Sequence, residues 1–125
     1  MNAHQRRTSA MLRFATWFCI ILLAVLSLLP AADMVRTDLP GRLEHFIAYA
    51  GSATVTVGGY GDRYGRMGVI GFYWVYAGIL EYLQQFSPGR HPSVWDFAAS
   101  ALGAFCGVVA ATLLARKLMS STSNG

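Results

Sequence analysis

The chain has 125 residues, of which 54% are hydrophobic and only 13% are charged, and its mean hydropathy is +0.41. This composition is too apolar for an ordinary soluble domain of that length, so the excess apolar surface is expected to face lipid. The formal net charge of +4 does not indicate nucleic-acid binding, because no run rich in Lys and Arg carries interleaved aromatic residues.

The first predicted membrane span is the apolar run of residues 12–29, which follows a basic segment, residues 1–11. At about 1.5 Å per residue, this run is just long enough to cross a hydrocarbon core of about 30 Å. Arg6, Arg7 and Arg13 are expected to anchor it on the cytoplasmic side. A cleaved signal peptide is the alternative interpretation, because Pro30 and two alanines follow the run.

A polar loop over residues 31–43 precedes the second predicted span, residues 44–60, which is moderately apolar and rich in Gly, Ser and Thr. That composition is typical of a helix that packs against other helices more than against lipid. Its polar residues recur at intervals of four, three and four, so they are expected to share one helix face: His45, Tyr49, Ser52 and Thr56.

The third predicted span, residues 67–86, follows a short turn over residues 61–66 and contains an acid, Glu81. A second polar turn leads to Ser93-Val94-Trp95-Asp96, a variant of the capping box that opens helices, and then to the fourth predicted span, residues 97–115. Small residues spaced four apart give this span a face that another helix can approach closely: Ala99, Gly103, Gly107 and Ala111. Residues 116–125 are expected to form a cytoplasmic tail.

The predicted fold is therefore all-α, a four-helix transmembrane bundle with both termini in the cytoplasm. This orientation places seven Lys and Arg residues on the cytoplasmic side and three outside, as the positive-inside rule requires. The predicted location is the cytoplasmic (inner) membrane, with the lipid bilayer as the main partner.

Six polar residues are expected to gather at the outer end of this bundle, and they form the candidate site: His45, Tyr49, Glu81, Gln84, Arg90 and Asp96. Glu81 needs a partner or a proton, since an isolated carboxylate inside a membrane costs several kcal/mol. Arg90 and His45 are its candidate partners. Structural interpretations compete with functional ones, with Asp96 as a helix cap, Arg90 as a clamp on an acid and His45 as a packing residue.

Neither cysteine indicates a metal site or a disulfide framework. Cys19 and Cys106 both lie inside apolar runs, and neither has a Cys or His neighbour at metal-ligand spacing. The sequence therefore predicts no metal and no cofactor.

Three segments carry a resemblance that extends over about residues 42–107. Residues 44–50 (EHFIAYA), 81–90 (EYLQQFSPGR) and 96–107 (DFAASALGAFCG) are similar, in order and spacing, to signature segments of the VanZ-like family of small integral membrane proteins. Those segments are His-Phe-x-x-Tyr-Ala, Glu-x-x-Gln-x-Phe-x-Pro-Gly-Arg and Asp-x-x-Ala-Asn-x-x-Gly-x-x-x-Gly. Two features depart from the family pattern: Gly41-Arg42 stands where Asp-Lys is frequent, and Ser100 stands where Asn is usual.

The resemblance implies a role in the cell envelope, because the name-giving member of the family is linked to low-level tolerance of the glycopeptide teicoplanin. We expect this role to be non-enzymatic, since the sequence shows no phosphate-cradling loop and no activated nucleophile. The residues leave two alternatives open. In the first, the chain is an enzyme acting on a lipid-linked envelope precursor, with Glu81 or His45 as acid–base and Arg90 holding a phosphate or carboxylate. In the second, it is a subunit of a transporter or proton path, in which Glu81 titrates inside a homo-oligomer.

Overall fold

The computed structural model describes all 125 residues, and it confirms the all-α class. Its elements are α1 (Ala3–Leu28), the short 3-10 helix η1 (Ala31–Asp33), α2 (Gly41–Leu83), the short 3-10 helix η2 (Gln84–Phe86) and α3 (Val94–Ser123). The prediction of four helices is wrong, because the segments expected over residues 44–60 and 67–86 belong to one element, α2. The intervening residues, expected to form a turn, keep helical backbone angles except at Gly65.

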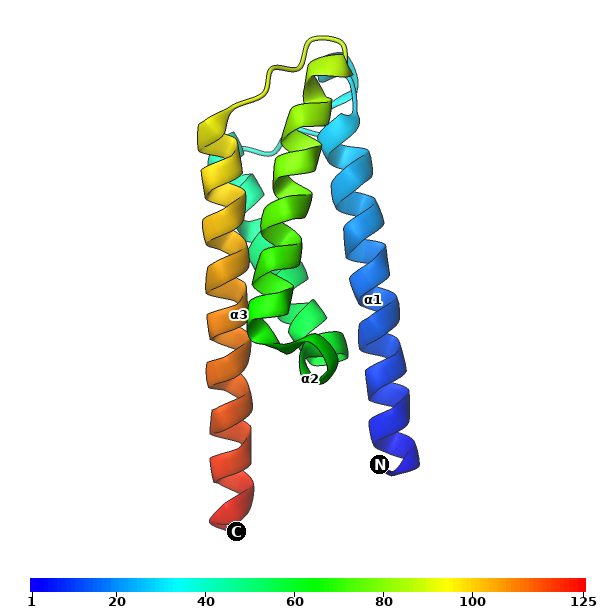
Figure 1. Cartoon of the computed structure of the whole chain (residues 1–125), viewed down its shortest axis with the longest axis vertical. Helices are drawn as coiled ribbons and strands as arrows, with labels where there is room; N and C mark the ends of the chain where they lie inside the picture. Colours follow the sequence, from blue (N-terminus) through cyan, green and yellow to red (C-terminus); the bar gives the residue numbers. More distant parts are fainter.

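The chain reverses its direction at Gly65, whose φ of 72° and ψ of 167° suit a residue without a Cβ. We call residues 41–64 the first arm of α2 and residues 66–83 its second arm. The reversal brings the hydroxyls of Thr56 and Tyr73 to 2.7 Å from each other. A straight helix would separate these two residues by about 25 Å along its axis. Figure 1 shows the two arms running in opposite directions.

The two ends of the molecule differ in what they contain (Figure 1). Both chain termini lie toward one end, and the bend at Gly65 points toward that end as well. Residues 29–40 and 84–93 connect the helices at the opposite end, which we call the loop end. The two connections touch there, since the backbone N–H of Ala31 donates to the carbonyl oxygen of Pro88 at 3.0 Å.

Helices α1 and α3 are both long and apolar enough to cross a membrane. Only 17% and 33% of their most apolar stretches are buried inside the structure, whereas the core helix of a soluble protein would be mostly buried. Both helices are longer than predicted. Helix α1 begins at Ala3 behind a capping box formed by Asn2 and Gln5, and α3 continues to Ser123 through the segment expected as a tail.

Helix α3 packs against the first arm of α2 through its glycines. A Cβ on Gly103 would lie 2.9 Å from the Cα of Phe46, and a Cβ on Gly107 would lie 2.9 Å from the Cα of Ala50. Larger residues would therefore collide with the α2 backbone. Ala99 and Ala111, on the same small-residue stripe, are only partly buried.

Helix α1 packs against α2 near its own N-terminal half. The Arg13 Nε–H donates to the Gly59 carbonyl oxygen at 3.0 Å, and the Trp17 indole N–H donates to the Tyr60 hydroxyl at 2.8 Å. Farther along, the Tyr76 hydroxyl donates to a backbone carbonyl of α1. Helix α1 is thus joined to both arms of α2.

Candidate functional site

The six predicted polar residues all lie toward the loop end, and Glu81 is close enough to Asp96, His45 and Arg90 to interact with their charges. His45, Tyr49 and Arg90 line one cavity, while Glu81 lines a second cavity of about 300 Å³ beside Ser93 and Tyr82. Gln84 and Asp96 line neither of these two cavities.

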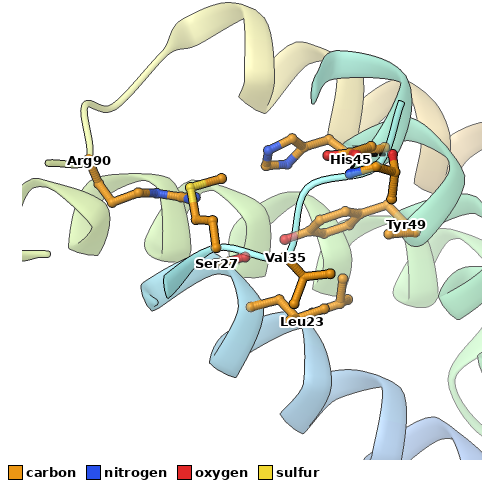
Figure 2. Close-up of a pocket in the computed structure, with 11 residues that line it drawn as sticks. Leu23, Ser27, Val35, His45, Tyr49 and Arg90 are labelled. Atoms are coloured by element: carbon orange, nitrogen blue, oxygen red, sulfur yellow. Dashed lines mark hydrogen bonds between the residues drawn. The ribbon is translucent and has the colours of Figure 1, made fainter. Parts of the chain in front are cut away.

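The first cavity, which we call the loop-end cavity, has a volume of about 280 Å³. It lies between α1, the connection after α1, the start of α2 and the loop before α3. Its polar lining consists of Ser27, Thr37, Glu44, His45, Tyr49 and Arg90. Figure 2 shows the side chains of Arg90, His45 and Tyr49 directed into this space from different sides.

Arg90 has no acidic partner in the structure. Its Nη1–H donates to the sulfur of Met34, which is a weak acceptor, and it forms no ion pair. The expected pairing of Arg90 with Glu81 is therefore not formed. The physical reason is that the loop carrying Arg90 packs over the end of α1, where Ser87 donates to the Leu28 carbonyl oxygen at 2.8 Å.

Glu81 instead holds the chain segment that starts α3. One of its carboxylate oxygens accepts the backbone N–H of Ser93 at 2.7 Å, and the side chain is only 8% exposed. Ser93 is the N-cap of α3, and its hydroxyl accepts the backbone N–H of Asp96. The acid thus secures the N-terminus of α3 to the second arm of α2.

Asp96 has two structural roles that match its interpretation as a residue of the helix start. It lies in the first turn of α3, where a negative charge is stabilised by the helix dipole. It also forms the one ion pair of the structure, with the Arg42 guanidinium 3.9 Å away. Arg42 is well exposed and lies over the Trp95 ring, so the pair is expected to contribute little to stability.

His45 contacts a hydroxyl from α3. Its Nδ1 lies 3.3 Å from the Oγ of Ser100, the residue that stands where the VanZ-like pattern usually has Asn. Ser100 is only 2% exposed and does not line the loop-end cavity. The contact therefore orients the imidazole from behind, while His45 itself remains part of the cavity wall.

Gln84 is buried, with 2% of its surface exposed, and its side-chain N–H₂ group has no hydrogen-bond partner. Such a group carries a desolvation cost of about 1–3 kcal/mol. We find no structural account for its burial.

Buried hydroxyl groups continue along α2 away from the loop-end cavity. Tyr73 and Thr56 pair with each other, and Tyr73 also reaches the Ser52 carbonyl oxygen at 3.3 Å. The Tyr49 ring, which lines the loop-end cavity, packs edge-on against the Tyr73 ring with the ring centroids 6.0 Å apart. The transporter alternative stays a prediction.

Sequence reasoning missed three residues that complete the site: Ser27, Glu44 and Ser100. Ser27 lies inside the apolar run of residues 12–29, so its pattern indicated only lipid contact. Glu44 begins α2 and its Oε1 accepts the backbone N–H of Thr37 at 3.2 Å as well as the Thr37 hydroxyl. Asp96, Ser100 and the buried Ala104 are spaced four apart in α3, so they share one face of that helix. This spacing is the signal that could have placed Ser100 on the inner face.

The structure gathers no group of three or more His, Cys, Asp and Glu side chains that could hold a metal ion. In comparisons with known proteins, no family model, no curated protein and no solved structure matches this chain. The resemblance to the VanZ-like family thus stays a prediction.

Proposed function

We propose that this chain is a multi-pass protein of the cytoplasmic membrane that binds a ligand in its loop-end cavity, outside the cell, without transforming it chemically. The observation that carries this proposal is Arg90, a cation that lines a cavity without an acidic partner. A guanidinium that lines a cavity without an ion pair is available to an external anion, and its bonds to a phosphate or carboxylate are strong.

The exposed surface supports the membrane location. Large apolar side chains point outward along α1 and α3, with Phe14 76%, Phe18 59% and Leu113 57% exposed. Contiguous apolar surface of this kind is unfavourable in water and favourable against lipid chains.

The distribution of basic residues supports the orientation. Three of them lie in the loop-end connections or at the start of α2, namely Arg36, Arg42 and Arg90. The other seven lie in the N-terminal half of α1, beside the Gly65 bend or in the C-terminal part of α3: Arg6, Arg7, Arg13, Arg63, Arg66, Arg116 and Lys117. By the positive-inside rule, the end that carries the termini and the Gly65 bend faces the cytoplasm.

One observation favours a membrane enzyme as a second candidate function, because Ser100 lies within hydrogen-bond reach of His45. Against that function, Ser100 is almost completely buried and lies behind the histidine as seen from the cavity. An attacking hydroxyl must reach the substrate, and this one does not. Ser100→Ala should therefore lower the cellular activity only in part, by loosening the His45 ring. Complete loss of activity in a Ser100→Ala protein of unchanged stability would favour the enzyme instead.

The cellular role that we propose is in envelope physiology, including tolerance of glycopeptides such as teicoplanin, as the VanZ-like resemblance implies. A strain lacking the gene should become more sensitive to cell-wall antibiotics, and the wild-type gene should restore tolerance. Arg90→Gln should fail to restore it, while Arg42→Gln, a change of equal charge at an exposed residue of the same end that lines neither cavity, should succeed. Equal restoration by both variants would overturn the role of the cavity.

A further inference from the structure

We propose that the loop-end cavity binds the headgroup of a zwitterionic membrane lipid, with its phosphate on Arg90 and its primary ammonium on Glu44. This inference rests on the proposed function, since it requires the loop end to lie at a membrane surface.

Two opposite charges line the cavity without neutralising each other. Arg90 and Glu44 are both lining residues, yet they form no ion pair. The guanidinium has only the Met34 sulfur as a protein partner. In Glu44, Oε1 accepts hydrogen bonds from Thr37, whereas Oε2 accepts none from the protein. A ligand that carries both a cation and an anion would satisfy both groups at once.

The chemistry of the two groups indicates which ligand charge goes to which residue. The planar guanidinium of Arg90 matches two phosphate oxygens, and charge-assisted bonds of this kind are the strong ones. The free carboxylate oxygen of Glu44 accepts an N–H from a primary ammonium, but it cannot do so from a quaternary one. The hydroxyls of Tyr49 and Ser27, which line the same cavity, can donate to further phosphate or ester oxygens.

The apolar part of the lining explains why the ligand is a lipid. Leu23, Leu26 and Val35 complete the wall on the side of α1 and the following connection. Leu26 is 42% exposed and Val35 is 73% exposed, so the cavity is bordered by side chains that also face the surroundings of the protein. Acyl chains attached to a bound headgroup can leave the cavity over these side chains and lie along α1.

The size of the cavity fits a headgroup and excludes a complete lipid. Sites for drug-sized ligands occupy about 300–1,000 Å³, and the loop-end cavity has about 280 Å³. The chains must therefore stay outside, in the bilayer.

The test measures lipid binding to the full-length protein purified in detergent, by native mass spectrometry and by the shift in unfolding temperature. The probes are phosphatidylethanolamine, phosphatidylglycerol, phosphatidylcholine and soluble phosphoethanolamine. Phosphatidylethanolamine should bind about tenfold tighter than the other two lipids, since each of these lacks one charge-assisted contact. Soluble phosphoethanolamine should bind more weakly than the lipid, because it lacks the chains.

Two variants localise the binding. Arg90→Gln and Glu44→Gln should each weaken phosphatidylethanolamine binding about tenfold, and Gln at position 44 keeps an acceptor for Thr37. The matched controls are Arg42→Gln and Asp38→Asn, two exposed residues of the same end that do not line the cavity, and they should leave the affinity unchanged.

Several outcomes would overturn the inference. Equal affinity for all three lipids, or an equal loss in the control variants, would show binding without headgroup recognition. Tighter binding of phosphatidylglycerol would indicate a site for an anion alone, and tighter binding of soluble phosphoethanolamine would indicate a soluble zwitterion. The two proposals can also be separated. If the protein shows no headgroup preference but Arg90→Gln still does not restore antibiotic tolerance, the lipid assignment is wrong and the proposed function is still supported.

Discussion

Gly103 of α3 lies directly on the backbone of Phe46 in the first arm of α2. A Cβ added at Gly103 would approach the Phe46 Cα to 2.9 Å and would come closer still to its carbonyl oxygen. The two helices can hold this separation only because position 103 has no side chain. Gly107 repeats the contact one turn later, against Ala50.

Gly103→Ala and Gly107→Ala should each destabilise the protein by about 1–3 kcal/mol, because the added methyl group forces the two helix backbones apart. The measurement is the free energy of unfolding in an SDS titration of the purified protein. Gly51→Ala and Gly71→Ala are the matched controls, since a Cβ there meets no atom within 4 Å. These controls should be neutral or should gain up to about 1 kcal/mol from helix propensity. Equal effects at all four glycines would contradict the packing.

Glu81→Leu should cost about 1–3 kcal/mol in the same titration, because it leaves the Ser93 N–H without its acceptor. Glu81→Gln should cost less, since the amide oxygen can still accept that bond. The double variant of Glu81→Gln and Arg90→Ala should be close to additive, because no ion pair joins the two residues. Breaking a buried ion pair costs about 3–5 kcal/mol. A coupling energy of that size between the two substitutions would show that Glu81 and Arg90 form the ion pair expected from the sequence.

Tyr73→Phe should lower the free energy of unfolding by about 1 kcal/mol, because it removes the hydroxyl that pairs with Thr56 at a buried position. The loss stays small since the Thr56 hydroxyl also lies 2.8 Å from the Ser52 carbonyl oxygen and keeps that bond. Tyr82→Phe serves as the control, because Tyr82 is 64% exposed. If Tyr73→Phe and Tyr82→Phe change the free energy of unfolding equally, then the hydroxyl pair does not stabilise the protein.

Reporter fusions should place the two ends of the molecule on opposite sides of the membrane. A reporter after Arg63 and one after Gly125 should be active as cytoplasmic fusions, and one near Asp38 should be active only outside. The expectation follows from the positions of the termini, the Gly65 bend and the loop end (Figure 1). A cytoplasmic signal at Asp38 would reverse the orientation and place the loop-end cavity inside the cell.

The sequence by itself determined the all-α class and the apolar character of the first and last helices, because hydrophobicity and helical periodicity are local properties of the chain. It also placed His45, Glu81 and Arg90 toward the same end. That inference needed only the order of apolar runs and turns. The small-residue spacing in the last helix likewise singled out Gly103 and Gly107, although it could not name the helix that meets them.

Only the tertiary structure decided how α2 reverses and which polar groups meet. The residues before Gly65 have the composition of a turn, yet backbone hydrogen bonding keeps them helical and a single glycine makes the reversal. The partner of Glu81 is the Ser93 N–H and not Arg90, because partner choice depends on how two connections distant in sequence pack over α1. Such contacts are set by the spatial path of the whole chain, and no local pattern contains that path.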